Sequence, residues 1–440
     1  MQIDNSWSLE QNLKDYYTYC ENVLPDILKA LPLGNHINVG IYGRGRHTKL
    51  MLTAYKTLVG KIDANITFID VPFDPCAEIY VGENAISVKD INKENFDAII
   101  LSSSDYEDRL FKSLVDEVDH DVLKNIPIYR FYDKYKSDIF WQQWQMVRFP
   151  DKPFSELPVL KFKVADVFKG SYDNPLSCVM DKYKLVVSDE PDIYIYMCYG
   201  NDHLGFTYPC IRVAFWGGES HLPDWNDCDY AITTREMPDE PRHYRYNAME
   251  PYNTMIQNRS QFMKKDMADR KFCNFVYSNG SYGEGALLRQ DFCKRLMNYK
   301  YVDCPGKVLN NMKDAITPRE GDWSRGKVEF IRNYKFTIAF ENERIDGYTT
   351  EKLYHPLRAG SIPIYWGNPL IGETVDNRCF INCNEYDNDF DAVIERVKEI
   401  DNDPELYLYM LGISPMKKGY RFDHYDGLEA FWMKIIEEKL

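Results

Sequence analysis

Short apolar segments alternate with amphipathic helical patterns along this chain, and no other feature restricts its fold as strongly. The first series reads "INVGIYGRGRHT", "KLMLTAYKTLV", "ITFID", "FDAIILSSS", "EDRLFKSLVDEV" and "IPIYRFY". A strand, a helix and a second strand in succession favour a parallel sheet with helices on its faces. The series therefore predicts a small Rossmann-like α/β domain at about residues 36–135. A helix from Ser8 to about Leu31 precedes it and should pack on the next domain.

A proline-rich segment, "RFPDKPFSELP", separates this series from two further ones. The second runs from "LKFKVADVF" to "CDYAITT", and the third from "KFCNFVYS" to "RCFINCN". At 440 residues the chain exceeds one ordinary core. We therefore predict three domains, at residues 1–150, 151–265 and 266–440, of which the last two form a pair of Rossmann-like lobes and the third ends in an amphipathic helix.

The composition excludes several classes of protein. The net charge is −15, from 53 basic and 68 acidic residues, which argues against a broad nucleic-acid-binding surface. The apolar runs are too short to span a membrane, and the start, "MQIDNSWSLEQ", lacks the pattern of a secretory signal. Eleven cysteines without a CxxC pair indicate reduced thiols in a cytoplasm rather than a zinc site.

The stretch "FENERIDGYTTEKLYHPLRAGSIPIYWGNP" combines a strand end, a polar loop and a capped helix start. The apolar run "KFTIAF" predicts a strand that delivers Glu341 and Asn342 into the loop. A helix should begin near Thr349 or Thr350, which are good capping residues, and should end before Gly360. The next strand, "SIPIYWG", then returns to the same sheet.

This loop and helix start should lie at the carboxyl edge of the sheet, where α/β proteins bind ligands. Free backbone N–H groups, together with Lys352 in the first helical turn, favour a phosphate there. The alternative role for Lys352 is that of a solvated helix cation. Pro356 lies in the middle of the predicted helix and cannot donate a backbone hydrogen bond, so we expect a kinked or short helix.

This stretch resembles the signature of the α-1,3/4-fucosyltransferases, which are GDP-fucose-dependent glycosyltransferases. The likeness extends through "RKFCNFVYSN", "VAFWGGES", "LKFKVADVF" and "VSDEPDIYIY", over roughly the last two-thirds of the chain. It implies a GT-B-like pair of lobes, with an acceptor-side lobe at residues 151–265 and a GDP-sugar-binding lobe at 266–440. The residues before the proline-rich segment show no such likeness, so residues 1–150 would be an accessory domain.

The resemblance also assigns donor-binding residues. It implies that Arg289 and Lys352 meet the diphosphate and stabilise the departing GDP. Further donor-site residues are Asn342, Tyr348 and Glu351, with Ser278 and Asn279 as weaker candidates.

Glu219 is the candidate catalytic base. It follows two glycines at the end of the buried segment "VAFW", so it should project from a carboxyl edge of the sheet. The alternative is an ordinary surface carboxylate. The resemblance implies that Glu219 takes the proton from the acceptor hydroxyl in a single inverting displacement.

Two weaker patterns point elsewhere. "GRGRHT" with Asp70 resembles a dinucleotide fingerprint, but Thr48 replaces its third glycine, so we do not expect bound NAD. Asp227-Cys228-Asp229 has the spacing of a manganese site in other glycosyltransferases, but these acids lead into a strand, so we expect no metal ion.

Taken with the composition, the resemblance implies a cytoplasmic bacterial fucosyltransferase of glycan biosynthesis, acting on lipopolysaccharide or in protein glycosylation. Its partners would be GDP-L-fucose and a glycan of the N-acetyllactosamine type, fucosylated on O3 of N-acetylglucosamine, with peripheral association to membrane-borne glycans and no cofactor. Two alternatives stay open: a transferase for another GDP-linked deoxy-sugar, and a non-catalytic carbohydrate-binding or scaffolding protein. The sequence leaves open the acceptor linkage, the ligand of the N-terminal domain, the oligomeric state and stimulation by a divalent metal.

Overall fold

The chain forms two compact units. The computed structural model describes residues 9–70, 81, 85–103, 107–130, 150, 153–167, 174–247, 270–312, 323–417 and 424–438. The first unit comprises Met1–Ile195, Tyr199–Ile211 and Glu429–Leu440, and the second comprises Tyr196–Cys198 and Arg212–Leu428. None of the described helices is long and apolar enough to cross a membrane.

The first unit contains the parallel sheet predicted for residues 36–135. Its strands are β1 (Asn38–Tyr42), β2 (Asn65–Ile69), β3 (Ala98–Leu101) and β4 (Ile128–Arg130), in the order β2-β1-β3-β4. All three strand pairs are parallel. The crossover helices include α3 (Arg46–Leu58) and α4 (Glu107–Glu117), and Leu110 and Leu114 of α4 pack into the core with Ile99. The fold predicted for this segment is confirmed.

The single helix predicted from Ser8 to about Leu31 is interrupted. The structure has α1 (Leu9–Thr18), a π-helical turn η1 (Tyr19–Val23) and α2 (Leu24–Lys29). Pro25 explains the interruption, because it has no N–H to donate to the preceding turn. As expected, the helix packs on the segment that follows it, where α2 lies against α3. It also contacts a segment much later in the chain, where the Tyr17 hydroxyl accepts a hydrogen bond of 2.8 Å from Leu185 N.

A second sheet has six strands in the order β10-β9-β8-β7-β5-β6. They are β5 (Val159–Ala165), β6 (Lys184–Val187), β7 (Ile193–Tyr196), β8 (Ile211–Trp216), β9 (Tyr230–Thr233) and β10 (His243–Arg245). β8 and β9 are parallel, and Trp216 lies opposite Thr233 at their carboxyl ends. The segments that follow these two strands, 217–222 and 234–236, therefore leave the sheet at the same edge.

The third sheet lies entirely in the second unit and has the order β12-β11-β13-β14-β15, with every pair parallel. Its strands are β11 (Lys271–Asn274), β12 (Val302–Asp303), β13 (Tyr334–Phe340), β14 (Ile362–Trp366) and β15 (Ile381–Asn382). The order reverses between β11 and β13. The loops after these two strands therefore flank a topological switch point, which is the usual ligand-binding position in such sheets.

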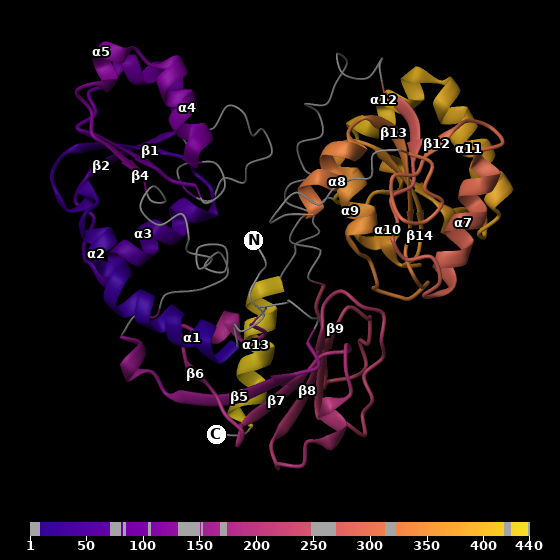
Figure 1. Cartoon of the computed structure of the whole chain (residues 1–440), viewed down its shortest axis with the longest axis horizontal. Helices are drawn as coiled ribbons and strands as arrows, with labels where there is room; N and C mark the ends of the chain where they lie inside the picture. The colour runs from indigo at the N-terminus through magenta and orange to yellow at the C-terminus, as the bar shows by residue number, and fades with distance from the viewer. Residues whose placement is uncertain are drawn as a thin grey trace. The chain divides into compact units, whose positions relative to one another are not determined.

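Helices cover both faces of this sheet. Phe336, Ile338 and Phe340 of β13 pack in one core cluster with α7 (Glu284–Leu296) and α11 (Phe390–Asn402). Ala339, on the opposite face, packs with α9 (Glu351–Ala359). Figure 1 shows α8 (Trp323–Ile331) and α9 on one side of the sheet and α7 and α11 on the other. Among the described residues, this part also has α10 (Ile371–Thr374) and α12 (Pro404–Gly412), whereas α13 (His424–Glu437) belongs to the first unit from Glu429 onward.

Candidate active site

The loops after β11 and β13 approach each other closely because two glycines, which have no Cβ, lie where they meet. Gly283 has a φ of +79°, and a Cβ on it would collide with Asn342 O. A Cβ on Gly285 would collide with Glu341 O, and Gly285 N donates a hydrogen bond of 2.8 Å to Asn342 O. The start of α7 is therefore held against the end of β13, which joins the two sides of the switch point.

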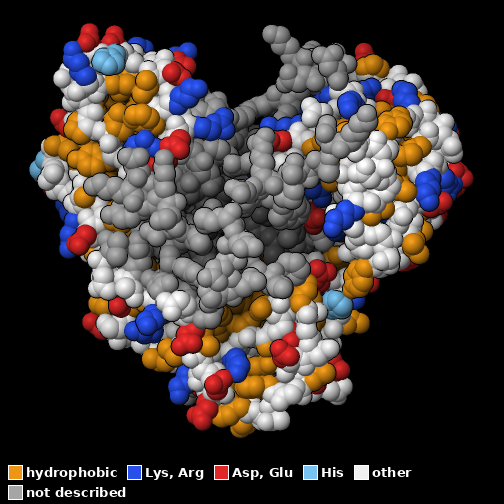
Figure 2. Space-filling view, viewed as in Figure 1, with side chains coloured by type: hydrophobic (Ala, Val, Ile, Leu, Met, Phe, Trp, Pro, Cys, Tyr) orange, Lys and Arg blue, Asp and Glu red, His pale blue; other side chains and the backbone are white. Residues whose placement is uncertain are grey.

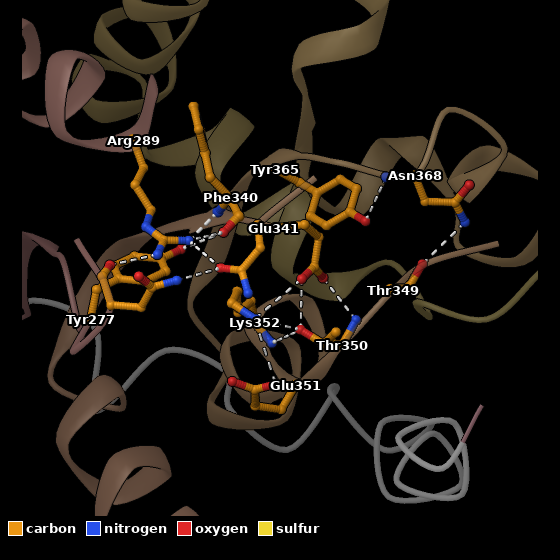
Figure 3. Close-up of polar contacts among 12 residues, drawn as sticks. Tyr277, Arg289, Phe340, Glu341, Thr349, Thr350, Glu351, Lys352, Tyr365 and Asn368 are labelled. Carbon is orange, nitrogen blue, oxygen red and sulfur yellow. Dashed lines mark hydrogen bonds and ion pairs between the residues drawn. The ribbon is translucent and has the colours of Figure 1, made fainter. Parts of the chain in front are cut away.

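Arg289 lies beneath these two loops. Its guanidinium donates to Asn279 O at 2.7 Å and to Asn342 Oδ1 at 3.0 Å, and it lies 4.1 Å from the ring centroid of Tyr277 (Figure 3). Asn279 Nδ2 in turn contacts Asn342 Oδ1 at 3.4 Å. The exposed fraction of Arg289 is 0%. Its positive charge is thus buried under the loops, and its hydrogen bonds fix the two predicted asparagines relative to each other.

Glu341 joins the end of β13 to the start of α9. This fully buried carboxylate accepts hydrogen bonds from Thr350 N and from Thr350 Oγ1, each of 2.7 Å, and Lys352 Nζ lies 3.3 Å from its Oε2 (Figure 3). Burial raises the pKa of Glu341, and the positive charge of Lys352 opposes the rise. Thr350 is the N-cap of α9 and Gly360 ends the helix with a left-handed backbone, as the sequence predicted.

Lys352 is shared among three partners. Its Nζ lies 3.0 Å from Thr350 Oγ1 and 3.9 Å from a carboxylate oxygen of Glu351, in addition to Glu341. Burial lowers the pKa of Lys352, but Glu351 and Glu341 outweigh this and keep the pKa above its ordinary value. Lys352 is 13% exposed, so the alternative of a solvated helix cation is wrong.

Lys327 of α8 is a site residue that sequence reasoning missed. Its Nζ lies 3.6 Å from Glu351 Oε1, and the two side chains are mostly buried. Burial raises the pKa of Glu351, but Lys352 and Lys327 outweigh it and hold the pKa below its ordinary value. Lys327, Lys352 and Pro356 line a cavity of about 10 Å³, which has room for about one water molecule and none for a sugar nucleotide. As predicted for Pro356, α9 is short, with 9 residues.

The rest of the loop after β13 packs on residues that follow β9 and β10. Gly347 has a φ of +85°, and a Cβ on it would meet Thr234 O at 2.5 Å. Asn247 Nδ2 donates a hydrogen bond of 2.8 Å to Thr349 O. Tyr348 is buried between these contacts, and burial, followed by the negative charges of Glu341 and Glu219, raises its pKa. The predicted base therefore lies within electrostatic range of the predicted donor site.

Glu219 lies in a loop, residues 217–222, that is held by its backbone. Three successive carbonyls in it, those of Glu219, Ser220 and His221, each accept a hydrogen bond from a side chain. The donors are Thr234 Oγ1 to Glu219 O at 3.0 Å, Arg235 Nε and Arg235 Nη2 to Ser220 O at 3.0 and 2.6 Å, and Trp216 Nε1 to His221 O at 2.9 Å. We call residues 217–222 the Glu219 loop. Its half-buried carboxylate belongs to the same compact unit as the donor-site residues.

The structure thus brings seven of the eight predicted residues into contact or electrostatic range of one another: Glu219, Asn279, Arg289, Asn342, Tyr348, Glu351 and Lys352. Ser278 is exposed in the loop after β11. The candidate site contains three further residues: Glu341, Thr350 and Lys327. The sequence pattern predicts Glu341 only as a strand-end residue, because no local signal marks its carboxylate as the partner of Lys352.

Residues of the two weaker sequence patterns bond to other residues of the chain. Arg44 pairs with Asp70 at 2.9 Å, and buried Thr48 donates a hydrogen bond to Gly43 O where a fingerprint would have its third glycine. Asp229 Oδ2 accepts a hydrogen bond of 2.8 Å from Arg212 N just before β9. Among the described residues, no group of three or more His, Cys, Asp or Glu side chains could hold a metal ion.

Two family models match the chain over the segments that build this site. Residues 160–252 match the alpha-(1,3)-fucosyltransferase FucT N-terminal domain, and residues 267–412 match the C-terminal part of glycosyltransferase family 10 (fucosyltransferase). Together they cover more than half of the chain, with Glu219 in the first and the other predicted residues in the second. The chain belongs to the fucosyltransferase family.

Individual relatives agree with this assignment. The alpha-(1,3)-fucosyltransferase FucT of Helicobacter pylori is 26% identical over 302 residues, which are 58% of this chain and 60% of that protein. Alpha-(1,3)-fucosyltransferase B of Drosophila melanogaster is 34% identical over 125 residues, 27% of this chain and 28% of that protein. The human GDP-fucose protein O-fucosyltransferase 3 is 32% identical over 123 residues, 27% of this chain and 25% of that protein. The chain therefore spans less than two thirds of the length of these curated relatives.

A solved structure shows the same fold. A crystal structure of an alpha1,3-fucosyltransferase superposes with a TM-score of 0.53 at 22% identity, covering 67% of this chain and 94% of that one. A crystal structure of an alpha1,3-fucosyltransferase with GDP-fucose superposes with a TM-score of 0.51 at 21% identity, covering 67% of this chain and 95% of that one. The predicted GT-B-like α/β fold is confirmed.

Proposed function

We propose that this protein is an inverting glycosyltransferase that moves L-fucose from GDP-L-fucose to a hydroxyl group of a glycan. The observation that carries the proposal is the arrangement of cations at one switch point. Arg289 lies under the loops after β11 and β13, and Lys352 lies in the first turn of α9. Such a pair of charges beside a helix N-terminus suits a nucleoside diphosphate.

The donor would bind along the ends of β11 and β13. Asn279 and Asn342, which Arg289 fixes, would supply polar groups, and the positive end of the α9 dipole would favour a phosphate. The N–H groups expected to be free at the start of α9 are partly occupied, because Thr350 N donates to Glu341 and Lys352 N donates to Thr350 Oγ1. When the bond to fucose breaks, negative charge grows on the diphosphate, and the preorganised charges of Arg289 and Lys352 stabilise it. In this proposal the two side chains supply the positive charge at the diphosphate, so no metal ion is required.

The acceptor hydroxyl would lose its proton to Glu219. The backbone of the Glu219 loop is held at three carbonyls, which limits the movement of its carboxylate relative to the donor site. A single displacement with this base inverts the configuration at the anomeric carbon. We propose O3 of N-acetylglucosamine in a glycan of the N-acetyllactosamine type, carried on a lipopolysaccharide or a protein, as the acceptor.

We also propose a cytoplasmic, bacterial setting for this reaction. The ten cysteines in the described part of the chain are all free thiols, which suits a reducing compartment. Basic and acidic side chains are interspersed among the coloured residues in Figure 2, which fits a ligand held by a few local cations.

The test is turnover. The protein is incubated with GDP-L-fucose and a panel of acceptors, and the linkage of each product is determined by NMR. An α-1,3 linkage on N-acetylglucosamine supports the full proposal. If the protein transfers a different GDP-linked deoxy-sugar and none from GDP-L-fucose, that sugar nucleotide is the donor instead of GDP-L-fucose. Binding of glycans without turnover of any donor would favour a non-catalytic carbohydrate-binding protein.

A further inference from the structure

An exposed aromatic side chain lies beside the Glu219 loop and has no part in the donor site. Tyr282, in the loop after β11, is 45% exposed. Its hydroxyl lies 3.2 Å from Nε2 of His221, and the two ring centroids are 6.4 Å apart. His221 is itself exposed and stands two residues after Glu219 in the loop. The next residue, Leu222, is 61% exposed and adds apolar surface. We call Tyr282 and His221 the aromatic pair.

The aromatic pair is fixed from both sides. On one side, the backbone of the Glu219 loop is held at three carbonyls, including that of His221. On the other side, Asn279 Oδ1 accepts hydrogen bonds from Ser281 N at 3.1 Å and from Tyr282 N at 2.9 Å. Asn279 is in turn bound by Arg289. A large exposed ring that is anchored in this way loses little entropy on binding a ligand.

The Tyr282 hydroxyl also lies within electrostatic range of the predicted base. Burial raises the pKa of Tyr282, and the carboxylates of Glu343 and Glu219 raise it further. A ligand that lies on the Tyr282 ring would also meet the His221 ring, which stands two residues after Glu219 in the same loop. A pyranose has the matching chemistry, because it presents an apolar C–H face on one side and hydroxyl groups around its edge.

We propose that Tyr282 and His221 bind the acceptor sugar and set the specificity for it. The C–H face of the sugar packs on the Tyr282 ring, and the His221 ring nitrogen exchanges its bond to Tyr282 for one to a sugar hydroxyl. This orients the reacting hydroxyl toward Glu219. The assignment rests on the proposed function, since it concerns the acceptor of that reaction.

The experiment uses the full chain with GDP-L-fucose and N-acetyllactosamine. Tyr282→Ala, Tyr282→Phe and His221→Ala are compared with Tyr301→Ala, a matched control because Tyr301 is 63% exposed in the same unit. The readouts are KM for the acceptor, KM for GDP-L-fucose, and hydrolysis of GDP-L-fucose without acceptor. We expect the acceptor KM to rise about tenfold in Tyr282→Ala, the scale of one lost aromatic contact, with the two donor readouts unchanged. The acceptor KM should rise less in Tyr282→Phe, because this variant keeps the aromatic ring.

Two outcomes overturn the inference while the proposed function stands. In the first, Tyr282→Ala and His221→Ala have the same acceptor KM as the control variant Tyr301→Ala. The other is an equal rise of the donor and acceptor KM values, which would mean that the aromatic pair only supports the loop. If the wild-type protein neither transfers nor hydrolyses GDP-L-fucose, the proposed function itself fails, and the inference fails with it.

Discussion

Replacing Lys352 by alanine tests the candidate site most directly, because it alters stability and donor binding for separate reasons. Lys352 Nζ lies 3.3 Å from Glu341 Oε2, and Glu341 is fully buried. Of the contacts that the structure describes, Glu341 would keep the two hydrogen bonds from Thr350. Breaking a buried ion pair costs about 3 to 5 kcal/mol, and the retained hydrogen bonds reduce this to about 2 to 3 kcal/mol near neutral pH.

The loss of stability in Lys352→Ala should depend on pH. Burial already raises the pKa of Glu341, and Lys352 lowers it, so removing the lysine raises the folded-state pKa further. A carboxyl whose pKa is higher in the folded state stabilises the fold when it is protonated, and this contribution is lost as pH rises through the folded pKa. The variant should therefore lose less stability at about pH 5 than at about pH 8.

The measurements are urea unfolding at both pH values and calorimetric titration with GDP. Loss of a charge-assisted contact of about 1.5 to 3 kcal/mol predicts roughly 10- to 150-fold weaker GDP binding. The double variant Lys352→Ala with Glu341→Gln is the matched control, since it removes the uncompensated charge and should be more stable than Lys352→Ala alone at about pH 8. A single variant as stable as the wild type at that pH, or unchanged GDP binding, would refute the reasoning.

Three further predictions follow from the same contacts. Glu219→Gln should cut turnover by roughly 10² or more, the scale of a lost general base, while GDP binding by calorimetry stays near normal; near-normal turnover would assign the base to another carboxylate, with Glu190 or Asp224 next to test. Arg289→Ala frees Asn279 and Asn342 and removes a buried cation, so the Kd for GDP should rise by at least about tenfold, and an unchanged Kd would contradict the donor assignment. A truncated chain beginning at Ser155 keeps every predicted donor-site residue and should bind GDP, but it lacks the Tyr17 contact to Leu185 and should melt at a lower temperature; an insoluble product would show that the accessory domain is not separable.

The sequence by itself determined the local structure of the candidate donor site. The apolar run of β13, the Thr350 cap, the first-turn Lys352 and the left-handed Gly360 are all local signals, and each element formed where these signals predicted it. Such signals are readable because their energetics involve only residues a few positions apart. The family signature added the roles of distant residues such as Glu219 and Arg289, which no local pattern supplies.

Only the tertiary structure decided how these residues contact each other. The partners of Arg289 are the Asn279 carbonyl and the side chain of Asn342, 53 positions away in the sequence. Lys327 comes from a helix without any distinguishing motif, and its burial beside Glu351 depends on the packing of α8 against α9. Likewise, the contact of Tyr282 with His221 spans 61 positions and depends on two separate loops meeting. Burial and the partners of a charge are properties of the packed chain, because they depend on which segments exclude water from it, and a sequence pattern records only neighbours along the chain.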